Sequence, residues 1–254
     1  MPRITATIIT LNEARNLKDC VDSLSGLVDE VLVLDSCSTD GTQDLARSLG
    51  AVVHEQPYAG NGPQRIRASA LASNDWILAI DADERLEPDL QEWLRDAEID
   101  EHSCYAFRRR NFLGDHWIRA AGFYPDEVVR LYNRRTAEYL PSAGHSRVAG
   151  DASRVSVRAH LRHLTFRDMA HWRQCLEWMT TRDAEAYVAG GGRVSPLAPL
   201  MHAVVALLRK LIGKGGAFQG RDGWRIAWMT ARRAWMKYSK IRSLQRTRPA
   251  GRVS

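Results

Sequence analysis

Short apolar runs alternate with helical patterns through roughly the first hundred residues, and this alternation limits the possible folds more than any other feature. The runs are rich in β-branched and aliphatic side chains, as buried strands are, and they lie at 4–11, 31–34, 51–54 and 76–80. Asn12, directly after the first run, is the expected N-cap of the first helix. Strands that alternate with helices form a mainly parallel sheet with helices on both faces. The expected fold class is therefore α/β.

Polar or acidic side chains directly follow three of these runs. They are Asn12 and Glu13 after the first run, Asp35 after the second, and Asp81, Asp83 and Glu84 after the fourth. Ligands of open α/β sheets bind beyond the carboxyl ends of the strands, so we expect these groups to share one crevice. Residues i and i+2 of an extended chain point the same way, which predicts that Asp81 and Asp83 project together around a cation. Oxygen ligands suit Mg²⁺ or Mn²⁺, which often also bind substrate phosphates.

Two common phosphate-binding motifs are missing from the sequence. Neither Gly-x-Gly-x-x-Gly after the first run nor Gly-x-x-x-x-Gly-Lys-Ser/Thr occurs, and both motifs bind phosphate through backbone amides. A diphosphate would then depend on the metal and on side-chain cations. Arg65 and Arg67, which precede the fourth run, are candidates for this role, although an exposed helix face would also explain them.

The pattern changes after Cys104. Runs at 105–110 and 128–132 have the composition of strands, with no helix between them, and an aromatic connection at 117–127 separates them. Long connections of this kind often carry function. Asp126 and Glu127, at the end of this connection, are candidate general bases.

The C-terminal third of the chain is expected to be helical. A capping-box-like start at Thr165 precedes a helix that ends at the glycines 190–192, and a second apolar helix covers 199–211. A glycine-rich loop at 213–223 separates it from a third helix. We therefore predict a catalytic domain at 1–164, a helical extension at 165–245, and a flexible basic tail at 246–254.

Basic residues are concentrated in the last quarter of the chain. From Pro196 onward there are thirteen Lys and Arg and one acid, net +12, whereas the remainder carries 23 basic and 29 acidic residues, net −6. Such a tail is expected to meet an anionic surface, either phospholipid or nucleic acid. Aromatic residues among these cations, with Ala231 on the same stripe, predict an interfacial membrane helix; they are Trp224, Trp228, Trp235 and Tyr238. The alternative is a helix docked on the protein body with its tryptophans in the core.

The remaining composition favours a cytoplasmic protein. The four cysteines are far apart and lack metal-site spacing, which fits a reducing compartment. The start of the sequence shows no signal-peptide pattern. No stretch reaches the length of about 18 uncharged apolar residues that a transmembrane helix needs.

Three motifs resemble family 2 glycosyltransferases of the GT-A fold. They are Ile-Ile-Thr-Leu-Asn-Glu (8–13), Leu-Asp-Ser-Cys-Ser-Thr-Asp-Gly-Thr (34–42) and Asp-Ala-Asp-Glu (81–84). More narrowly, the chain is similar to the lipopolysaccharide core-biosynthesis glycosyltransferases of Gram-negative bacteria, of the β-1,4-glucosyltransferase type. The segments that carry this narrower resemblance are 123–126, 129–134, His163 and 213–223. The resemblance implies a GT-A domain followed by a C-terminal helical extension.

The resemblance also implies roles for individual residues. Asp35 would bind the nucleotide base, Asp81 would face the ribose, and Asp83 would coordinate the metal ion, Mn²⁺ or Mg²⁺, on the donor diphosphate. The remaining positions expected to line the nucleotide pocket are Thr10, Asn12 and Glu13.

Asp126 stands where the family's catalytic base is expected. The implied reaction is a single inverting displacement, in which a carboxylate takes the proton of the attacking hydroxyl. The family's usual donor, UDP-glucose, is the expected donor, and a lipopolysaccharide core or another lipid-linked saccharide is the expected acceptor. Such an acceptor would place the enzyme on the anionic inner face of the inner membrane, with no nucleic acid as partner.

Two other function classes compete with this one. A sugar-phosphate nucleotidyltransferase also places metal-binding acids on a nucleotide-binding sheet, but it would be expected to show a glycine-rich basic loop after the first strand, where residues 10–13 stand instead. A non-catalytic membrane or nucleic-acid binder would use the basic tail and would leave the converging acids without a role.

Overall fold

A computed structural model describes residues 2–141 and 147–247 of the chain. The chain forms two compact units. The first, which we call the sheet unit, comprises Met1–Arg110 and Pro125–Leu164, and the second, the helical unit, comprises Asn111–Tyr124 and Thr165–Ser254. Residues 111–124 lie inside the predicted catalytic domain, yet they belong to the helical unit.

The sheet unit is built on a mixed sheet with strand order β3-β2-β1-β4-β8-β6-β11-β5. Its first half is parallel and contains β1 (Ile4–Thr10), β2 (Glu30–Asp35), β3 (Val52–Glu55) and β4 (Trp76–Asp81). In its second half β8 (Asp126–Asn133) pairs antiparallel with β4 and with β6 (Ser103–Leu113), and β11 (Ser153–Phe166) pairs antiparallel with β5 (Glu84–Leu86). Short strands are β7 (His116–Trp117), which pairs with β6, and the pair β9 (Ala137–Tyr139) and β10 (Val148–Gly150).

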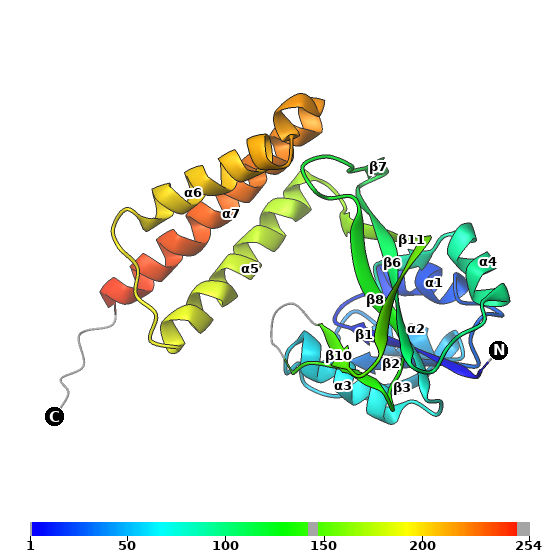
Figure 1. Ribbon diagram of the computed structural model, residues 1–254. Helices are drawn as coiled ribbons and strands as arrows, with labels where there is room; N and C mark the ends of the chain where they lie inside the picture. The colour runs from blue at the N-terminus through cyan, green and yellow to red at the C-terminus, as the bar shows by residue number, and fades with distance from the viewer. Residues whose placement is uncertain (1, 142–146, 248–254) are drawn as a thin grey trace. The chain divides into compact units, whose positions relative to one another are not determined.

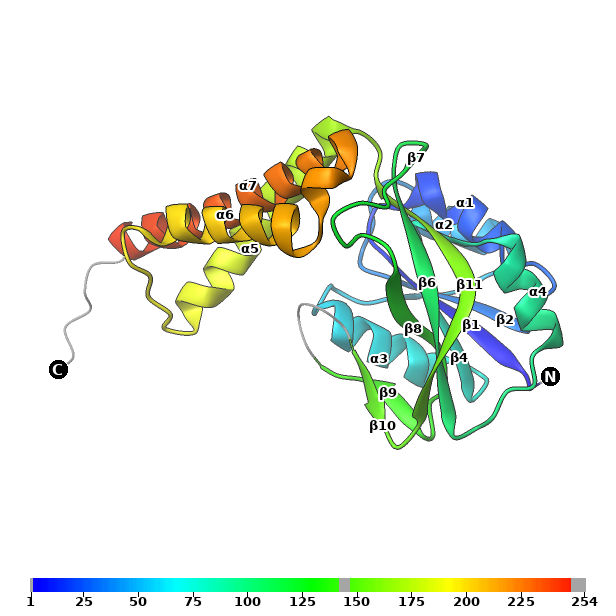
Figure 2. The same cartoon turned by 45° about the horizontal axis from the view of Figure 1, so that its top comes forward.

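Helices cover both faces of the parallel half (Figures 1 and 2). On one face Leu78 and Ile80 of β4 join a core with α1 (Ala14–Asp22), α2 (Thr42–Ser48) and α4 (Pro88–Asp96). On the other face Leu32 and Leu34 of β2 pack with Ala68 of α3 (Asn61–Leu71). Val33, between these two leucines, belongs to the first core, so alternate residues of β2 serve opposite faces, as the strand period of two requires. The predicted α/β class, with helices on both faces, is confirmed.

Two predicted helix caps are wrong. The N-cap of α1 is Glu13, because Asn12 has a left-handed backbone (φ 58°), which asparagine tolerates better than most residues. Its side chain instead accepts a hydrogen bond of 2.9 Å from the amide of Thr39. Thr165 belongs to β11, and the side chain of Asp168 caps the following helix by accepting from the His171 amide at 2.7 Å.

The helical unit consists of α5 (Met169–Ala189), α6 (Ala198–Leu208) and α7 (Gly220–Thr247). A π-helical turn (Arg209–Gly213) follows α6, and a 3₁₀ turn (Gly216–Phe218) lies in the predicted glycine-rich loop, whose last residues belong to α7. Position 223 has room only for glycine, because a Cβ there would lie 1.9 Å from the carbonyl oxygen of Gly216. None of the described helices combines the length and apolar character that a bilayer-spanning segment needs.

A separate hydrophobic core explains why residues 111–124 belong to the helical unit. Ile118 and Ala121 are almost fully buried and pack in one cluster with Trp172 of α5 and with Ile226 and Met229 of α7. The predicted tail at 246–254 begins inside α7, which extends to Thr247. The rest of that tail lies outside the described residues.

Candidate active site

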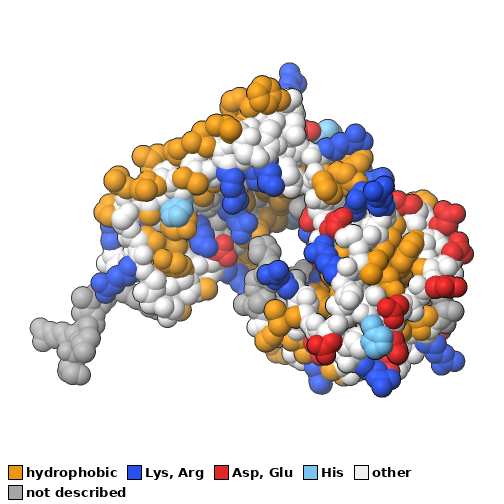
Figure 3. Space-filling model, viewed as in Figure 1, with side chains coloured by type: hydrophobic (Ala, Val, Ile, Leu, Met, Phe, Trp, Pro, Cys, Tyr) orange, Lys and Arg blue, Asp and Glu red, His pale blue; other side chains and the backbone are white. Residues whose placement is uncertain are grey.

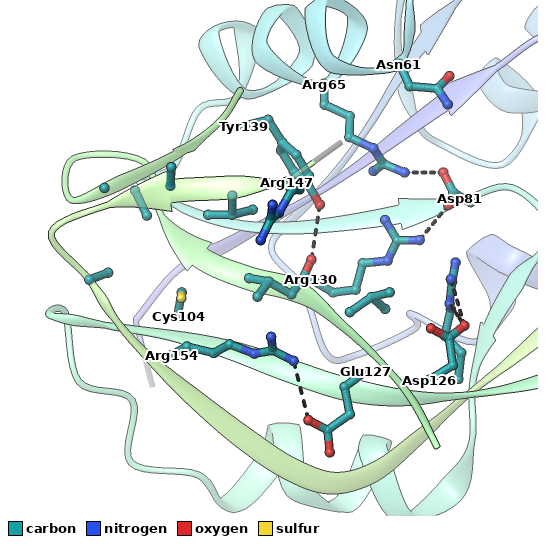
Figure 4. A pocket seen from close by; sticks show the side chains of 18 residues that line it. Asn61, Arg65, Asp81, Cys104, Asp126, Glu127, Arg130, Tyr139, Arg147 and Arg154 are labelled. Atoms are coloured by element: carbon teal, nitrogen blue, oxygen red, sulfur yellow. Dashed lines mark hydrogen bonds and ion pairs between the residues drawn. The ribbon is translucent and has the colours of Figure 1, made fainter. Parts of the chain in front are cut away.

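A cavity of about 570 Å³ opens in the sheet unit (Figure 4). It is bounded by α3, by β6 and β8, by the pair β9 and β10, and by the carboxyl end of β4. Three of the predicted site residues, Arg65, Asp81 and Asp126, line it together. The predicted residues that do not line it are Thr10, Asn12, Glu13, Asp35 and Asp83.

Asp81 lies between two arginine side chains. Its Oδ2 is 2.5 Å from Nη2 of Arg130, and its Oδ1 accepts a hydrogen bond from Arg65. Nη2 of Arg130 also lies 2.5 Å from Oε1 of Glu84, whose side chain is fully buried. Burial opposes ionisation of Asp81, but the charges of Arg130, Arg65 and His163 outweigh it and hold the pKa of this carboxyl well below its usual range. Asp81 is therefore a carboxylate throughout the physiological pH range.

Arg130→Met should lower the free energy of unfolding by about 3–5 kcal/mol, because it leaves the buried carboxylate of Glu84 and the half-buried carboxylate of Asp81 without their shared cation. Chemical denaturation checks this value. The matched control is Arg154→Met, which removes an exposed arginine paired with Glu127 at 3.4 Å and should cost no more than about 1 kcal/mol. Equal effects of the two substitutions would show that the network around Arg130 contributes no more to stability than an exposed ion pair does.

Asp83 does not continue the strand of Asp81. β4 ends at Asp81 and residues 82–83 form a turn into β5, so the expectation that the two side chains share one direction is wrong. Oδ2 of Asp83 instead lies 3.3 Å from Nε2 of His163 on β11. Burial would lower the pKa of His163, but the Asp83 carboxylate outweighs burial and raises it.

The carboxylates at the strand ends do converge. The pKa of Glu13 is raised to about 7, and burial is the largest cause. A hydrogen bond from Asn16 lowers this pKa, whereas repulsion from Asp83, Asp81 and Asp40 raises it. Groups that repel one another in this way are stabilised by a cation. Carboxylate oxygens suit Mg²⁺ or Mn²⁺, and a histidine nitrogen is a common metal ligand. The residues around Asp83 therefore fit the expected divalent metal.

A second group of acids lies outside the cavity. Among the described residues, Glu87, Asp89 and His160 form the set of three whose ligand atoms all lie within 4.8 Å of one another. Nδ1 of His160 is 2.5 Å from Oδ2 of Asp89, and Glu87 pairs with Arg110. This set contains none of the predicted site residues, and it provides a natural comparison for Asp83.

Asp35 organises the loop between β2 and α2. Its side chain is fully buried and accepts hydrogen bonds from Thr10 Oγ1 at 2.8 Å and from the Ser38 amide at 2.7 Å. The Ser38 hydroxyl donates to Oδ1 of Asp35 at 2.6 Å and accepts a hydrogen bond from the Asn12 amide at 2.7 Å. Thr10, Asn12 and Asp35 thus form one hydrogen-bonded group at the ends of β1 and β2, next to β4 in the sheet.

Asp126 and its neighbour Glu127 point to different partners (Figure 4). Oδ2 of Asp126 is 2.8 Å from Nη2 of Arg109, whose Nη1 is 3.5 Å from Oε1 of Glu84. Glu127 accepts from Ser156 Oγ at 2.8 Å and pairs with Arg108 at 3.3 Å. Asp126 is thereby connected to the Glu84 and Asp81 network, and Glu127 is not.

The side chains that hold the acids in place were not expected from the sequence; they are Arg109, Arg130 and His163 with its partner Asp83. Arg130 carries a visible signal, because a charged side chain between apolar residues of a strand needs a buried partner. The partner of His163 could not be found from its position, since it depends on the register that sets His163 opposite Glu84.

The comparisons with known proteins agree with the motifs. An uncharacterized glycosyltransferase of Rickettsia felis is 48% identical over 144 residues, which are 55% of this chain and 50% of that protein. Lipopolysaccharide core biosynthesis glycosyltransferase LpsC of Rhizobium meliloti is 34% identical over 139 residues, 52% of this chain and 49% of that protein. The chain thus spans about half the length of the curated relatives it matches.

Glucosyl-3-phosphoglycerate synthase of Mycobacterium tuberculosis is 37% identical over 92 residues, 32% of this chain and 28% of that protein. Its crystal structure with Mn²⁺ and uridine-diphosphate-glucose aligns with a TM-score of 0.36 and 28% identity, covering 44% of each chain.

The family model for glycosyl transferase family 2 matches residues 5–155, which is more than half of the chain. This range contains all three motifs on which the resemblance rests, and it ends within β11 of the sheet unit. The chain belongs to glycosyl transferase family 2 and is a glycosyltransferase.

Proposed function

We propose that this glycosyltransferase moves a sugar with inversion from a nucleotide-sugar donor, UDP-glucose, to a lipopolysaccharide-core or other lipid-linked saccharide, with Mn²⁺ or Mg²⁺ bound. The observation that carries the proposal is the placement of Glu13, Asp81 and Asp83 at the carboxyl ends of the neighbouring strands β1 and β4. This group lies at the end of the strand whose last residue, Asp81, also lines the cavity that contains Asp126.

Asp83 and His163 would hold the metal, which when bound offsets the negative charge that develops on the leaving diphosphate. The group of Thr10, Asn12 and Asp35, with Glu13 beside it, would line the nucleotide. Arg65 is held by Asp81 on the cavity wall and would add a positive charge near the diphosphate.

Asp126 would act as the general base. The acceptor hydroxyl attacks the sugar C1 from the face opposite the diphosphate, the C1–oxygen bond to the diphosphate breaks, and the hydroxyl proton passes to Asp126. Arg109 fixes the carboxylate through a contact of 2.8 Å. No covalent intermediate with the protein is needed for a single displacement.

The names of two relatives support the choice of sugar and acceptor. The Mycobacterium tuberculosis relative is named as the synthase of a glucosyl compound, glucosyl-3-phosphoglycerate, and the Rhizobium meliloti relative is named for lipopolysaccharide core biosynthesis. Incubation with labelled nucleotide sugars, with and without Mn²⁺, tests the proposal. Metal-dependent release of nucleoside diphosphate supports it, and formation or consumption of pyrophosphate would identify a nucleotidyltransferase instead.

We propose that the helical unit rests on an anionic membrane surface, which for a lipid-linked acceptor would be the cytoplasmic face of the inner membrane. Trp224, Trp228 and Trp235 are 55%, 65% and 49% exposed, which argues against the alternative that they fill the core. The predicted stripe is incomplete, since Ala231 is buried and Tyr238 stacks on His202 at 3.7 Å. Further exposed apolar side chains gather over α6 (Figure 3); they are Leu197, Leu200, Met201, Val204, Val205 and Leu208.

We expect the intact protein to sediment with anionic vesicles at low salt and with neutral vesicles only weakly. Each nearby Lys or Arg contributes about 1 kcal/mol of attraction to an anionic surface, and salt screens it. Insertion of apolar side chains is not screened, so binding should fall but not vanish as salt rises. A monodisperse protein that stays in the supernatant with anionic vesicles at low salt would rule out the membrane position.

A point substitution is a better probe here than truncation. Removal of everything after Gly192 would delete Ile226 and Met229, which complete the core around Ile118, and would cause aggregation for structural reasons. Val205→Asp changes a residue that is 61% exposed, so it should weaken vesicle binding while leaving the thermal unfolding midpoint nearly unchanged.

A further inference from the structure

The helical unit contains a groove of about 980 Å³ between its three helices, a volume typical of small-molecule sites. One wall is the face of α6 formed by Leu200, Ala203, Val204 and Leu207, and the other is the face of α7 formed by Trp228, Ala231, Trp235 and Met236. The α6 residues follow the helical spacing i, i+3, i+4, i+7, and the α7 residues follow i, i+3, i+7, i+8, so each set lies on one face of its helix. The two walls are therefore apolar along about two turns of helix.

Charged side chains stand along the edge of this groove. Arg173 of α5 and Arg232 of α7 line it and are exposed. Neither forms a hydrogen bond or ion pair with any residue in 2–141 or 147–247. Glu177, the acid in the lining, is neutralised by Lys240 at 2.7 Å. The edge thus carries two positive charges that no carboxylate of the described chain balances.

The shape of the groove favours a single chain over a flat surface. Ala231 lies in it and is only 7% exposed, whereas Trp228 beside it is 65% exposed. A bilayer surface can contact the outer tryptophan, but an inserted hydrocarbon chain is needed to reach the alanine. A second copy of this protein would bring like charges together at the groove edge, which is unfavourable.

We infer that this groove binds one hydrocarbon chain of a lipid whose anionic phosphate head group pairs with Arg173 and Arg232. Arginine suits this role because its guanidinium binds phosphate oxygens in a bidentate manner. The site is distinct from the cavity of the sheet unit, so it does not depend on the identity of the donor. It would allow the helical unit to hold a single lipid molecule in addition to resting on a membrane surface.

Calorimetric titration of the full chain with octyl, decyl and dodecyl phosphate below their micelle concentrations tests the inference. Affinity should rise by about four-fold for each methylene that enters the groove. Inorganic phosphate should not bind detectably, and dodecyl maltoside, which lacks the charge, should bind more weakly than dodecyl phosphate. Affinity that is independent of chain length, or equal binding of inorganic phosphate, would overturn the inference.

Two neighbouring valines give a matched pair of variants. Val204 lines the groove and Val205 does not, although both are exposed, at 44% and 61%. Val204→Asp should reduce the affinity for dodecyl phosphate by at least ten-fold, and Val205→Asp should leave it unchanged, with circular dichroism to confirm that both fold. Equal losses in the two variants would place the lipid elsewhere.

The arginines are tested separately, so that the inference does not depend on one variant. Arg173→Gln and Arg232→Gln should each weaken dodecyl phosphate binding by about five-fold, from the attraction of one basic side chain to an anionic lipid. Arg221→Gln, which removes an exposed arginine of α7 outside the groove, is the control and should have no effect. Sedimentation velocity distinguishes a bound lipid from a dimer, and dimerisation through the groove would contradict the inference.

Discussion

Asp83→Asn should abolish sugar transfer and remove the metal-dependent binding of the donor, while the protein remains folded. Asp83 lies in the turn after β4, its side chain is 29% exposed, and its carboxylate faces His163 at 3.3 Å. An amide keeps the shape of the side chain but loses the negative charge that a divalent cation requires. The measurements are the rate of nucleoside diphosphate release and the rise in melting temperature with UDP-glucose and Mn²⁺, since a bound ligand stabilises the folded state by mass action.

Asp89→Asn is the matched control for this prediction. Asp89 also pairs with a histidine of β11, His160 at 2.5 Å, but it belongs to the separate group with Glu87 and is not among the acids that act on Glu13. We expect Asp89→Asn to keep Mn²⁺-dependent transfer. If Asp89→Asn loses the response to Mn²⁺ and Asp83→Asn keeps it, the metal is bound by the group of Glu87, Asp89 and His160 instead.

Asp126→Asn should bind the donor nearly as well as the unchanged protein but turn over about 10²-fold more slowly or worse, which is the usual scale for removal of a general base. The asparagine can still accept a hydrogen bond from Arg109, so the cavity wall should keep its shape. Separate measurement of donor affinity and of the rate at saturating donor resolves the two effects. A loss of donor binding without a loss of maximal rate would assign Asp126 to the donor site.

Glu127→Gln provides the comparison one residue away. Glu127 lines the same cavity, but it pairs with Arg108 and Ser156 and has no contact with the network around Glu84. Its substitution should reduce the rate much less than Asp126→Asn does. The reverse order, with Glu127→Gln inactive and Asp126→Asn active, would exchange the roles of the two neighbours.

The parallel half of the sheet could be predicted because its signals are local. Each buried strand is a short apolar run, each helix repeats at its own period, and the acids stand directly after the strands. The antiparallel half could not be predicted in the same detail. Arg130 reaches Asp81 because β8 lies beside β4, and His163 reaches Asp83 because β11 lies beside β5. Such pairings join positions roughly 50 to 80 residues apart, and no local pattern encodes them.

Local geometry limited the prediction at two further points. The expectation for Asp81 and Asp83 assumed a strand that continues to residue 83, but the chain turns at 82–83. The sequence did not reveal that residues 111–124 belong to the helical unit, because their apolar residues resemble those of any hairpin connection. The residues that cover Ile118 come from α5 and α7, far along the sequence.

The chain's path through residues 111–124 has a consequence for its synthesis. Ile118 emerges from the ribosome more than a hundred residues before Met229, one of the side chains that bury it. At about 5–20 residues per second, the interval is on the order of ten seconds. During that time the strands on either side of the segment are already available for pairing, while its apolar tip has nothing to pack against. The apolar tip therefore stays exposed on the nascent chain until the last third has been made, and slower translation of that third would prolong the exposure.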